Sequence, residues 1–146
     1  MTKHLWSLFV TVTILAHFGC NRLPERPAGM PDLVPCTVCV TFGGQKLEGV
    51  GVVFEPKDTA AKPWPGGGKT DAEGRAVLKT AAYYNGIVPG EYIVQFQKYA
   101  EPEMGTDGMP LPAKPLVPLR YGPGRSKETV VVTPEQAEYV FELESL

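Results

Sequence analysis

The chain has 146 residues, with 14 basic and 16 acidic side chains and a formal net charge of −2. A chain of this length builds one ordinary domain, and its balanced charge, without runs of like charge, argues against a surface for nucleic acid or anionic membranes. The 15 prolines and 16 glycines are too many for a helical protein of this length and favour a loop-rich all-β domain.

Residues 1–19 have the form of an export signal. Lys3 precedes an apolar run from Leu5 to Phe18, which is shorter than the roughly 20 residues that span a bilayer. The run ends at Gly19-Cys20, which resembles the cleavage site of bacterial lipoproteins, in which the cysteine is lipidated and becomes the first mature residue. His17 stands where such signals usually carry leucine, so simple secretion and an uncleaved anchor stay open. We expect export, with Cys20 as the site of lipid attachment.

Residues 20–35 form a proline-rich segment with few large apolar side chains. Its prolines predict an extended, semi-rigid tether, and they are Pro24, Pro27, Pro31 and Pro35. Such a tether would hold a folded domain, residues 36–146, away from a membrane surface.

From Cys36 onward, short runs rich in Val, Phe and Tyr alternate apolar and polar residues and end at Gly, Pro or Asp. In one run, Tyr92, Val94 and Phe96 share one face, as in a strand with one buried side. This alternation predicts a β-sandwich. Six strands are read directly, with a seventh expected, and the six runs are 36–42, 49–56, 75–80, 91–98, 128–133 and 138–144.

The segment Thr70–Thr80 places an acidic pair beside a glycine and then turns apolar. Asp71 and Gly74 occupy the first and fourth positions of a type I turn, where the carboxylate accepts a bond from the backbone two residues on and glycine tolerates positive φ. A calcium loop would need further oxygen ligands, but the residues after Gly74 read RAVLKTAA. We interpret Asp71 and Gly74 as a structural turn, with an adventitious cation site as the alternative.

The glycine run at Gly66–Gly68, followed by Lys69 and Thr70, looks like the end of a phosphate-binding loop. Pro63 stands in the place of the leading glycine, however, and no strand-to-helix context surrounds the run. We interpret it as a flexible loop.

Cys36 and Cys39 have the spacing of a redox or zinc motif. A redox pair sits at a helix N-terminus, whereas these cysteines lie in a strand pattern, and a zinc site would need a second pair of ligands. Three residues along a strand span about 10 Å and point the thiols to opposite faces. We expect two structural cysteines, with a local disulfide as the alternative in an oxidising compartment.

The two histidines, His4 and His17, both lie in the export signal. The mature domain therefore lacks the base that activates a serine or cysteine nucleophile, and it lacks histidine metal ligands. Glu101, Glu103 and Asp107 lie near one another, but in a proline-rich loop with no apolar surroundings that would make one of them a proton donor. We expect no catalytic residue, no metal and no cofactor.

Several segments together resemble a known domain family. They read VTFGGQKLEGVGVVFEP, KTDAEGRAVL, GIVPGEYIVQFQK and VPLRYGPGRSKETVVV, with a final YVFEL. From Val38 to Leu143 the succession is similar to the carboxypeptidase regulatory-like, transthyretin-like β-sandwich domain of small exported lipoproteins of the planctomycete type. Its most specific pieces are the TD-x-x-GR turn at Thr70–Arg75, the PGEY segment at Pro89–Tyr92, and a proline–tyrosine–serine segment formed by Pro118, Tyr121 and Ser126.

The resemblance implies a single seven-stranded antiparallel β-sandwich, prealbumin-like or immunoglobulin-like, and usually no catalysis. Transthyretin-related hydroxyisourate hydrolases share the architecture, but they use histidines and a C-terminal Tyr-Arg-Gly-Ser signature, whereas this chain ends FELESL. We expect a non-catalytic, lipid-anchored module of the cell envelope that binds a partner or acts as a spacer, on a membrane facing the periplasm or the cell exterior. A carbohydrate-binding module is the alternative, and a transthyretin-related hydrolase is less favoured.

Two connections are longer than a hairpin needs, Lys57–Lys69 and Tyr99–Gly124. Loops at the ends of a sandwich carry recognition, so these connections are the candidate surface for an envelope protein or a glycan, with no nucleic acid expected. Aromatic side chains supply the candidate anchors, which are Trp64, Tyr83, Tyr84 and Tyr121. The structural alternative is that Tyr121 packs on the sandwich and Trp64 covers its edge.

Overall fold

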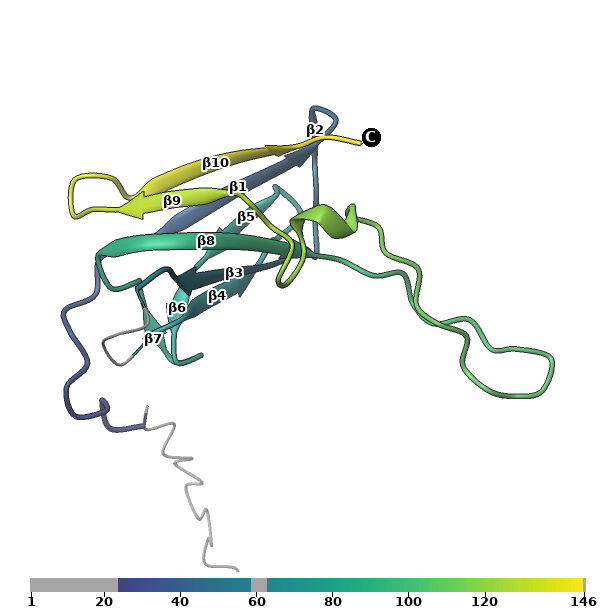
Figure 1. The fold of residues 1–146 in the computed structure, drawn as a ribbon, viewed down its shortest axis with the longest axis horizontal. Coiled ribbons are helices and arrows are strands. Elements are labelled where there is room, and N and C mark those ends of the chain that lie inside the picture. Colours follow the sequence, from purple (N-terminus) through teal and green to yellow (C-terminus); the bar gives the residue numbers. More distant parts are fainter. Residues whose placement is uncertain (1–23, 59–62, 146) are drawn as a thin grey trace, which may run out of the picture.

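A computed structural model describes residues 24–58 and 63–145, which form two β-sheets and one short 3-10 helix (Figure 1). The predicted all-β, sandwich-like fold is confirmed for this part of the chain. The predicted export signal and the lipid attachment site Cys20 lie outside the described residues.

The larger sheet has six strands in the order β7-β6-β4-β3-β8-β9, and every neighbouring pair is antiparallel. β8 is the longest of them and lies between β3 and β9. The strands are β3 (Gly51–Pro56), β4 (Gly66–Lys69), β6 (Lys79–Thr80), β7 (Tyr84–Asn85), β8 (Gly90–Gln97) and β9 (Thr129–Val132).

The smaller sheet is built around β1, and one of its pairings corrects the expectation of an antiparallel sandwich. β1 pairs antiparallel with β2 and β5 but parallel with β10. β10 does not follow β1 through a hairpin; it arrives from β9 in the other sheet, so its connection does not impose an antiparallel direction. The strands are β1 (Thr37–Phe42), β2 (Gln45–Lys46), β5 (Arg75–Val77) and β10 (Glu138–Leu143).

The strand count among the described residues also differs from the seven expected. There are ten strands, three of which have two residues. Each of the six predicted runs contains a strand, but the run 75–80 is divided between the sheets, since β5 pairs with β1 and β6 pairs with β4. The chain changes sheets at the fully buried Leu78, which is how strands form the corners of packed sheets.

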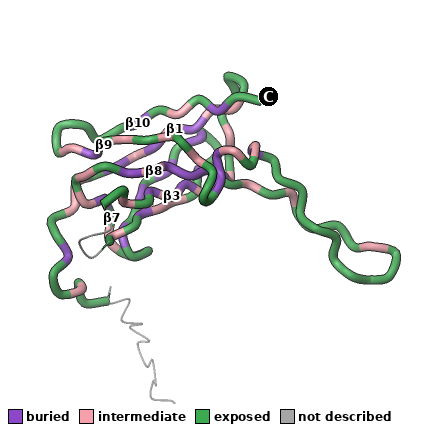
Figure 2. Tube along the Cα trace, in the orientation of Figure 1, coloured by how far each residue is buried: buried purple, intermediate pink, exposed green. Residues whose placement is uncertain are grey.

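The core lies between the sheets and follows the predicted alternation (Figure 2). In β8, Tyr92, Val94 and Phe96 are buried, as the period of two predicts. Aromatic rings join the two layers, with ring centroids 5.1 Å apart between Phe96 of β8 and Phe141 of β10. The long strands β1, β3, β8 and β10 therefore bury apolar side chains between the sheets, the arrangement expected of a two-layer β domain.

The glycine run that we interpreted as a flexible loop is the strand β4, which is a correction. Glycine has a low strand propensity, so the run gives no strand signal in the sequence. Glycine is needed here because neighbouring backbone approaches closely. A Cβ added at Gly67 would lie 2.9 Å from the Val52 carbonyl oxygen, and one added at Gly68 would lie 2.9 Å from the Val77 carbonyl oxygen. β4 therefore fits between β3 and the chain crossing from β5 to β6 because its first three residues, Gly66–Gly68, have no side chains.

The described part of the proline-rich segment packs on the sandwich. Val34 and Ile87 exchange two backbone hydrogen bonds, both 2.9 Å long. Met30 is buried, and the Tyr84 hydroxyl donates to the Pro24 carbonyl oxygen at 2.5 Å. The segment thus reaches the sandwich at the start of β8, which fixes the end of the domain at which the chain enters.

Candidate functional site

The connection after β8 forms a ribbon that projects from the sandwich (Figure 1). We refer to residues 99–116 as the arm. Its two halves are held together by backbone hydrogen bonds: Ala100 N–H donates to Lys114 O at 2.8 Å, and Leu111 N–H donates to Glu103 O at 2.7 Å. The arm is therefore an ordered two-stranded ribbon whose backbone donors are partly satisfied within itself.

A tight turn closes the tip of the arm. Gly105 N–H donates to Met109 O at 2.7 Å, and Gly108 N–H donates to Gly105 O at 3.0 Å. The Asp107 carboxylate accepts the Met109 N–H at 3.0 Å, and Gly108 has a φ of 76°, which favours glycine. Asp107 is thus an exposed residue of the turn, and its carboxylate binds the turn backbone.

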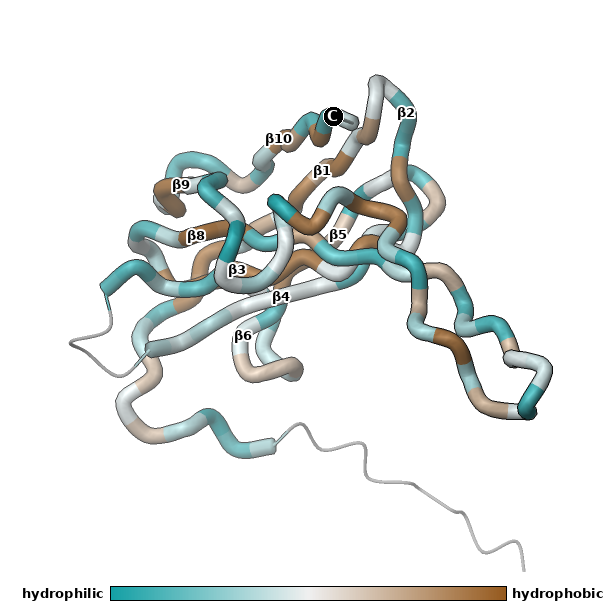
Figure 3. Tube along the Cα trace, turned by 45° about the vertical axis from the view of Figure 1, so that its right-hand side comes forward, coloured by the Kyte–Doolittle hydropathy of each residue, from teal (hydrophilic) through white to brown (hydrophobic). Residues whose placement is uncertain are grey.

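The arm contains apolar residues and projects away from the sandwich (Figure 3). Met104 and Met109 are each 68% exposed. Of the ten exposed large apolar side chains among the described residues, five lie on the arm: Tyr99, Met104, Met109, Leu111 and Leu116. Such a concentration of exposed apolar side chains marks a candidate protein-binding surface.

The candidate anchor Tyr121 belongs to the core. It lies in the 3-10 helix η1 (Leu119–Tyr121), is 7% exposed, and packs edge-on against Phe96 with ring centroids 6.4 Å apart. Its hydroxyl accepts the Glu144 N–H and an Arg120 guanidinium N–H, both at 3.0 Å. The structural alternative therefore holds for Tyr121, which fixes the base of the arm and presents no ring to a partner.

β8 separates the end at which the chain enters from the end at which the arm leaves (Figure 1). Ile87, which pairs with Val34, precedes β8, and Tyr99 follows it. Eight strand residues at about 3.3 Å each span roughly 25 Å. The arm and the N-terminal segment consequently project from opposite ends of the domain.

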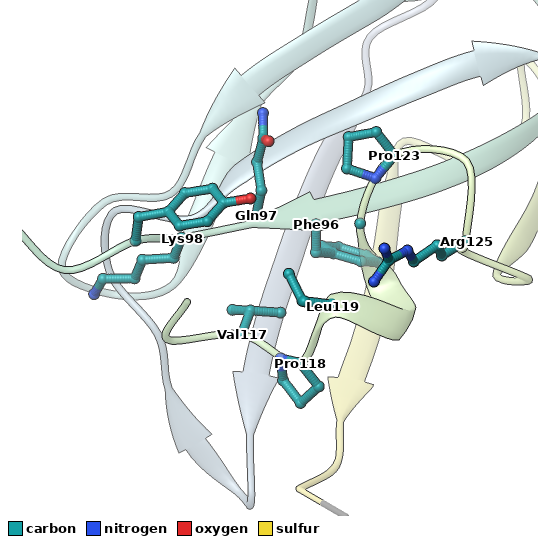
Figure 4. Close-up of a pocket in the computed structure, with 10 residues that line it drawn as sticks. Phe96, Gln97, Lys98, Val117, Pro118, Leu119, Pro123 and Arg125 are labelled. Atoms are coloured by element: carbon teal, nitrogen blue, oxygen red, sulfur yellow. The ribbon is translucent and has the colours of Figure 1, made fainter. Parts of the chain in front are cut away.

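A cavity of about 280 Å³ lies at the base of the arm (Figure 4). Apolar side chains line its centre, with Lys98 and Arg125 on opposite sides of them. Lys98 Nζ donates to the Glu48 carbonyl oxygen at 2.5 Å, which fixes that charge near the cavity. The apolar lining comes from β8 and from the chain around η1: Phe96, Val117, Pro118, Leu119 and Pro123.

A second hollow, a groove of about 660 Å³, contains the candidate anchor Trp64. Lys57 Nζ and Glu91 Oε2 form an ion pair at 3.0 Å on its rim. Tyr83 is exposed between β6 and β7, Tyr84 binds Pro24, and neither lines this groove. The three candidate aromatic anchors of the loops thus do not form one sugar-stacking platform. The groove is lined mainly by Pro31, Pro56, Pro63, Trp64, Pro89 and Tyr92.

Asp71 and Gly74 lie in a turn between β4 and β5. Asp71 Oδ1 accepts the Glu73 N–H at 3.0 Å and the Arg75 N–H at 2.8 Å. Gly74 N–H donates to the Asp71 carbonyl oxygen at 3.0 Å, and Gly74 has a φ of 74°. This is the arrangement that the sequence pattern predicts, since the carboxylate binds the backbone two residues on.

Replacing Asp71 with asparagine should change the free energy of unfolding by less than about 0.5 kcal/mol, because an amide oxygen still accepts the turn bonds. Replacing Asp71 with alanine should cost about 1–2 kcal/mol, because two backbone N–H groups lose their acceptor. Denaturant unfolding of both variants measures these values. A folded Asp71→Asn protein that had lost a binding activity would contradict a purely structural role.

Cys36 and Cys39 are both free thiols. Burial raises the pKa of Cys36 to about 12. The Cys39 thiol donates to Glu138 Oε1 at 3.0 Å, and this hydrogen bond, together with partial burial, raises the pKa of Cys39. Arg75 shares the same carboxylate oxygen at 3.1 Å. A raised thiol pKa keeps both sulfurs protonated and poorly nucleophilic, which fits structural cysteines.

Among residues 24–58 and 63–145, no three His, Cys, Asp or Glu side chains lie close enough together to hold a metal ion. Over the same ranges, no helix has the length and apolar character needed to cross a membrane.

Glu101 and Glu103 are exposed on the arm, beside the exposed methionines. The sequence identified the long connection but not the two methionines as its apolar surface. Their acidic and proline neighbours, outside any strand pattern, were the available signal that these methionines are exposed.

Comparisons of the chain with known protein families, with curated proteins and with solved structures found no match.

Proposed function

We propose that this chain is a non-catalytic binding module of the cell envelope, anchored through a lipid on Cys20, with the arm as its recognition element. The observation that carries the proposal is the arm itself: an ordered ribbon that exposes Met104 and Met109 at the end of the domain opposite to the N-terminal segment. A domain anchored at one end and binding at the other holds its partner away from the membrane.

The construction of the arm favours protein binding over a passive spacer. Methionine side chains are flexible and polarizable, and they adapt to apolar partner surfaces. The ribbon is already ordered by its own hydrogen bonds, and its prolines restrict the backbone further, so binding removes little conformational entropy. A spacer would gain nothing from exposing these side chains to water.

The remaining chemistry of the described residues supports a module without catalysis. The two thiols are protonated by their surroundings, and the sequence has no histidine after His17. The carboxylates near one another on the arm lie in solvent, without the burial that tunes a catalytic acid. We assign the chain, on the segments that carry the resemblance, to the carboxypeptidase regulatory-like domains of exported lipoproteins, on a membrane facing the periplasm or the cell exterior.

Site-specific photo-crosslinking in cells tests the role of the arm. A photoreactive amino acid at Met109 of the full chain should give a discrete crosslinked product. The matched control is Tyr83, which is also large, apolar and exposed but lies on the turn between β6 and β7. Equal crosslinking from both positions, or none from Met109, would contradict the proposal.

Removal of the arm provides a second experiment on the same proposal. Tyr99 and Pro115 are bridged across the ribbon, so residues 100–114 can be replaced by Asn-Gly, which closes a two-residue hairpin. Val117 and Tyr121, which are buried, stay in place. Binding should be lost while the thermal midpoint stays within a few degrees of that of the intact protein.

Replacing Cys20 with serine should move the protein from the membrane fraction to the soluble exported fraction, because one residue carries the proposed lipid. Fractionation and mass spectrometry of the mature N-terminus measure this change. A mature terminus elsewhere, with Cys20 unmodified or removed, would sink the anchor, and retention of the Cys20→Ser protein in the membrane would point to an uncleaved signal.

Glycan binding in the groove beside Trp64 is the second candidate function. The groove favours it because it combines an indole with a row of proline side chains and a charged pair on its rim. Retention of the protein on insoluble envelope polysaccharide, undiminished when the arm is replaced, would favour this candidate over the arm.

A further inference from the structure

Charges of opposite sign are separated between the arm and its base. The arm is net acidic, with Glu101, Glu103, Asp107 and Lys114 as its charged residues. The chain that follows, residues 117–127, has no acidic residue and carries Arg120, Arg125 and Lys127. The backbone hydrogen bonds within the arm keep it extended, so its acidic residues do not fold back onto the basic residues 117–127 of the same chain.

The cavity at the base has the size of a side-chain pocket. Its volume of about 280 Å³ lies at the lower limit of the roughly 300–1,000 Å³ of small-molecule pockets, and it has room for one large side chain. Phe96, Val117 and Leu119 give it an apolar centre, with Lys98 on one side and Arg125 on the other (Figure 4). Such a lining fits an apolar side chain that has carboxylates as its neighbours.

Arg125 is available for this contact. Its side chain is exposed and makes no hydrogen bond or ion pair with any residue that the structure describes. Arg125 also lines a second hollow, together with Arg120, Lys127, Glu128 and Glu144. Three basic side chains stand against two acidic ones in this hollow, and Lys98 adds a further positive charge to the neighbouring cavity, so the base of the arm attracts an acidic partner.

The arm supplies the ligand chemistry that the base requires. Met104 directly follows Glu103, and Met109 lies two residues after Asp107, so both exposed methionines have carboxylates beside them. We propose that the partner of the arm is a second copy of this chain: the arm of each copy docks on the base of the other and places a methionine in its cavity. The inference rests on the proposed function of the arm.

A two-fold axis makes the contact reciprocal, because the same two surfaces occur on both copies. With the arms antiparallel, each acidic tip meets a basic base, and the contact is made twice. Parallel arms would instead place Glu103 beside its counterpart and Arg125 beside its counterpart, which like-charge repulsion disfavours. Charge thus selects the antiparallel arrangement.

Sedimentation velocity of the full chain in detergent, at increasing concentrations, tests the proposal. The unaltered protein should form a dimer. Arg125→Glu and Glu103→Lys should each raise the dimer dissociation constant by about tenfold or more, because each opposes like charges at both contacts. Mixing the two variants in equal amounts should restore the dimer as a heterodimer, since both contacts then pair opposite charges. Glu135→Lys, in the exposed turn between β9 and β10, should leave the dissociation constant unchanged.

A protein that is monomeric at all concentrations, or a mixture of the two variants that fails to dimerise, would overturn the second copy as the partner. The crosslinking experiment separates this result from failure of the proposed function. A product from Met109 with twice the mass of the chain supports the dimer. A product with a different protein, together with a monomer in sedimentation, leaves the arm as the binding element but refutes self-association, and the lack of any product refutes both.

Discussion

Replacing Gly74 with valine should lower the free energy of unfolding by about 2–4 kcal/mol. Gly74 has a φ of 74°, where a β-branched residue is strained, and an added Cβ would lie 2.7 Å from the Val40 carbonyl oxygen. Gly74 O also accepts the Val40 N–H at 2.8 Å, so the turn and β1 cannot separate without losing a bond. Denaturant unfolding at equilibrium measures the loss.

Gly124 is the matched control for this prediction. It has a φ of 68°, but nothing lies within 4 Å of its added Cβ, so Gly124→Val tests backbone strain alone. We expect a cost of about 1 kcal/mol there. If both variants lose the same stability, close approach to β1 contributes nothing at Gly74, and the turn is less constrained by its neighbour than its geometry indicates.

Replacing Gly66 with alanine should cost about 2–3 kcal/mol, because the added Cβ would lie 2.0 Å from Ile87 Cδ1. Ile87 is fully buried, so it cannot swing into solvent to make room. Gly66 is the first residue of β4, and Ile87 pairs with Val34 of the N-terminal segment. Overpacking between them therefore strains both the pairing of β4 with β3 and the pairing of the N-terminal segment with the sandwich.

A double-mutant cycle isolates this contact. Ile87→Val removes the clashing Cδ1 and alone should cost about 1 kcal/mol. In the double variant the alanine has room, so the total loss should fall below the sum of the single losses by about 1 kcal/mol or more. Additive losses would show that Gly66 is required for a reason other than the space that Ile87 occupies.

The strands could be predicted from the sequence where apolar and polar residues alternate. They could not be predicted where a strand consists of glycines, and strand direction could not be predicted where the partners are far apart in the sequence. The alternation of Tyr92, Val94 and Phe96 reports directly which face of β8 is buried. β4 was not predicted because its glycines carry no hydrophobic pattern. Its glycines are required by the close approach of neighbouring backbone, which the sequence does not show. The parallel pairing of β10 with β1 was not predicted because strand direction depends on connections across the two sheets.

The candidate site shows the same division. A long proline-rich connection was recognisable as a surface feature, but its residues do not all have the same role. Tyr121 and Val117, near the end of the connection, are buried, whereas Met104 and Met109 are exposed, and no local pattern distinguishes these pairs. Which apolar residues of a loop pack on the domain depends on where the chain returns to the core, which is a tertiary property.

The pairing of the first strand with the last has a consequence for the order of events during synthesis and folding. Cys39 of β1 and Glu138 of β10 bond across 99 residues of sequence. Pairing over such a separation requires closure of a very long loop, and it slows folding. The smaller sheet cannot be completed until β10 has left the ribosome. For a chain proposed to cross a membrane before it folds, this late step keeps the translocating polypeptide open.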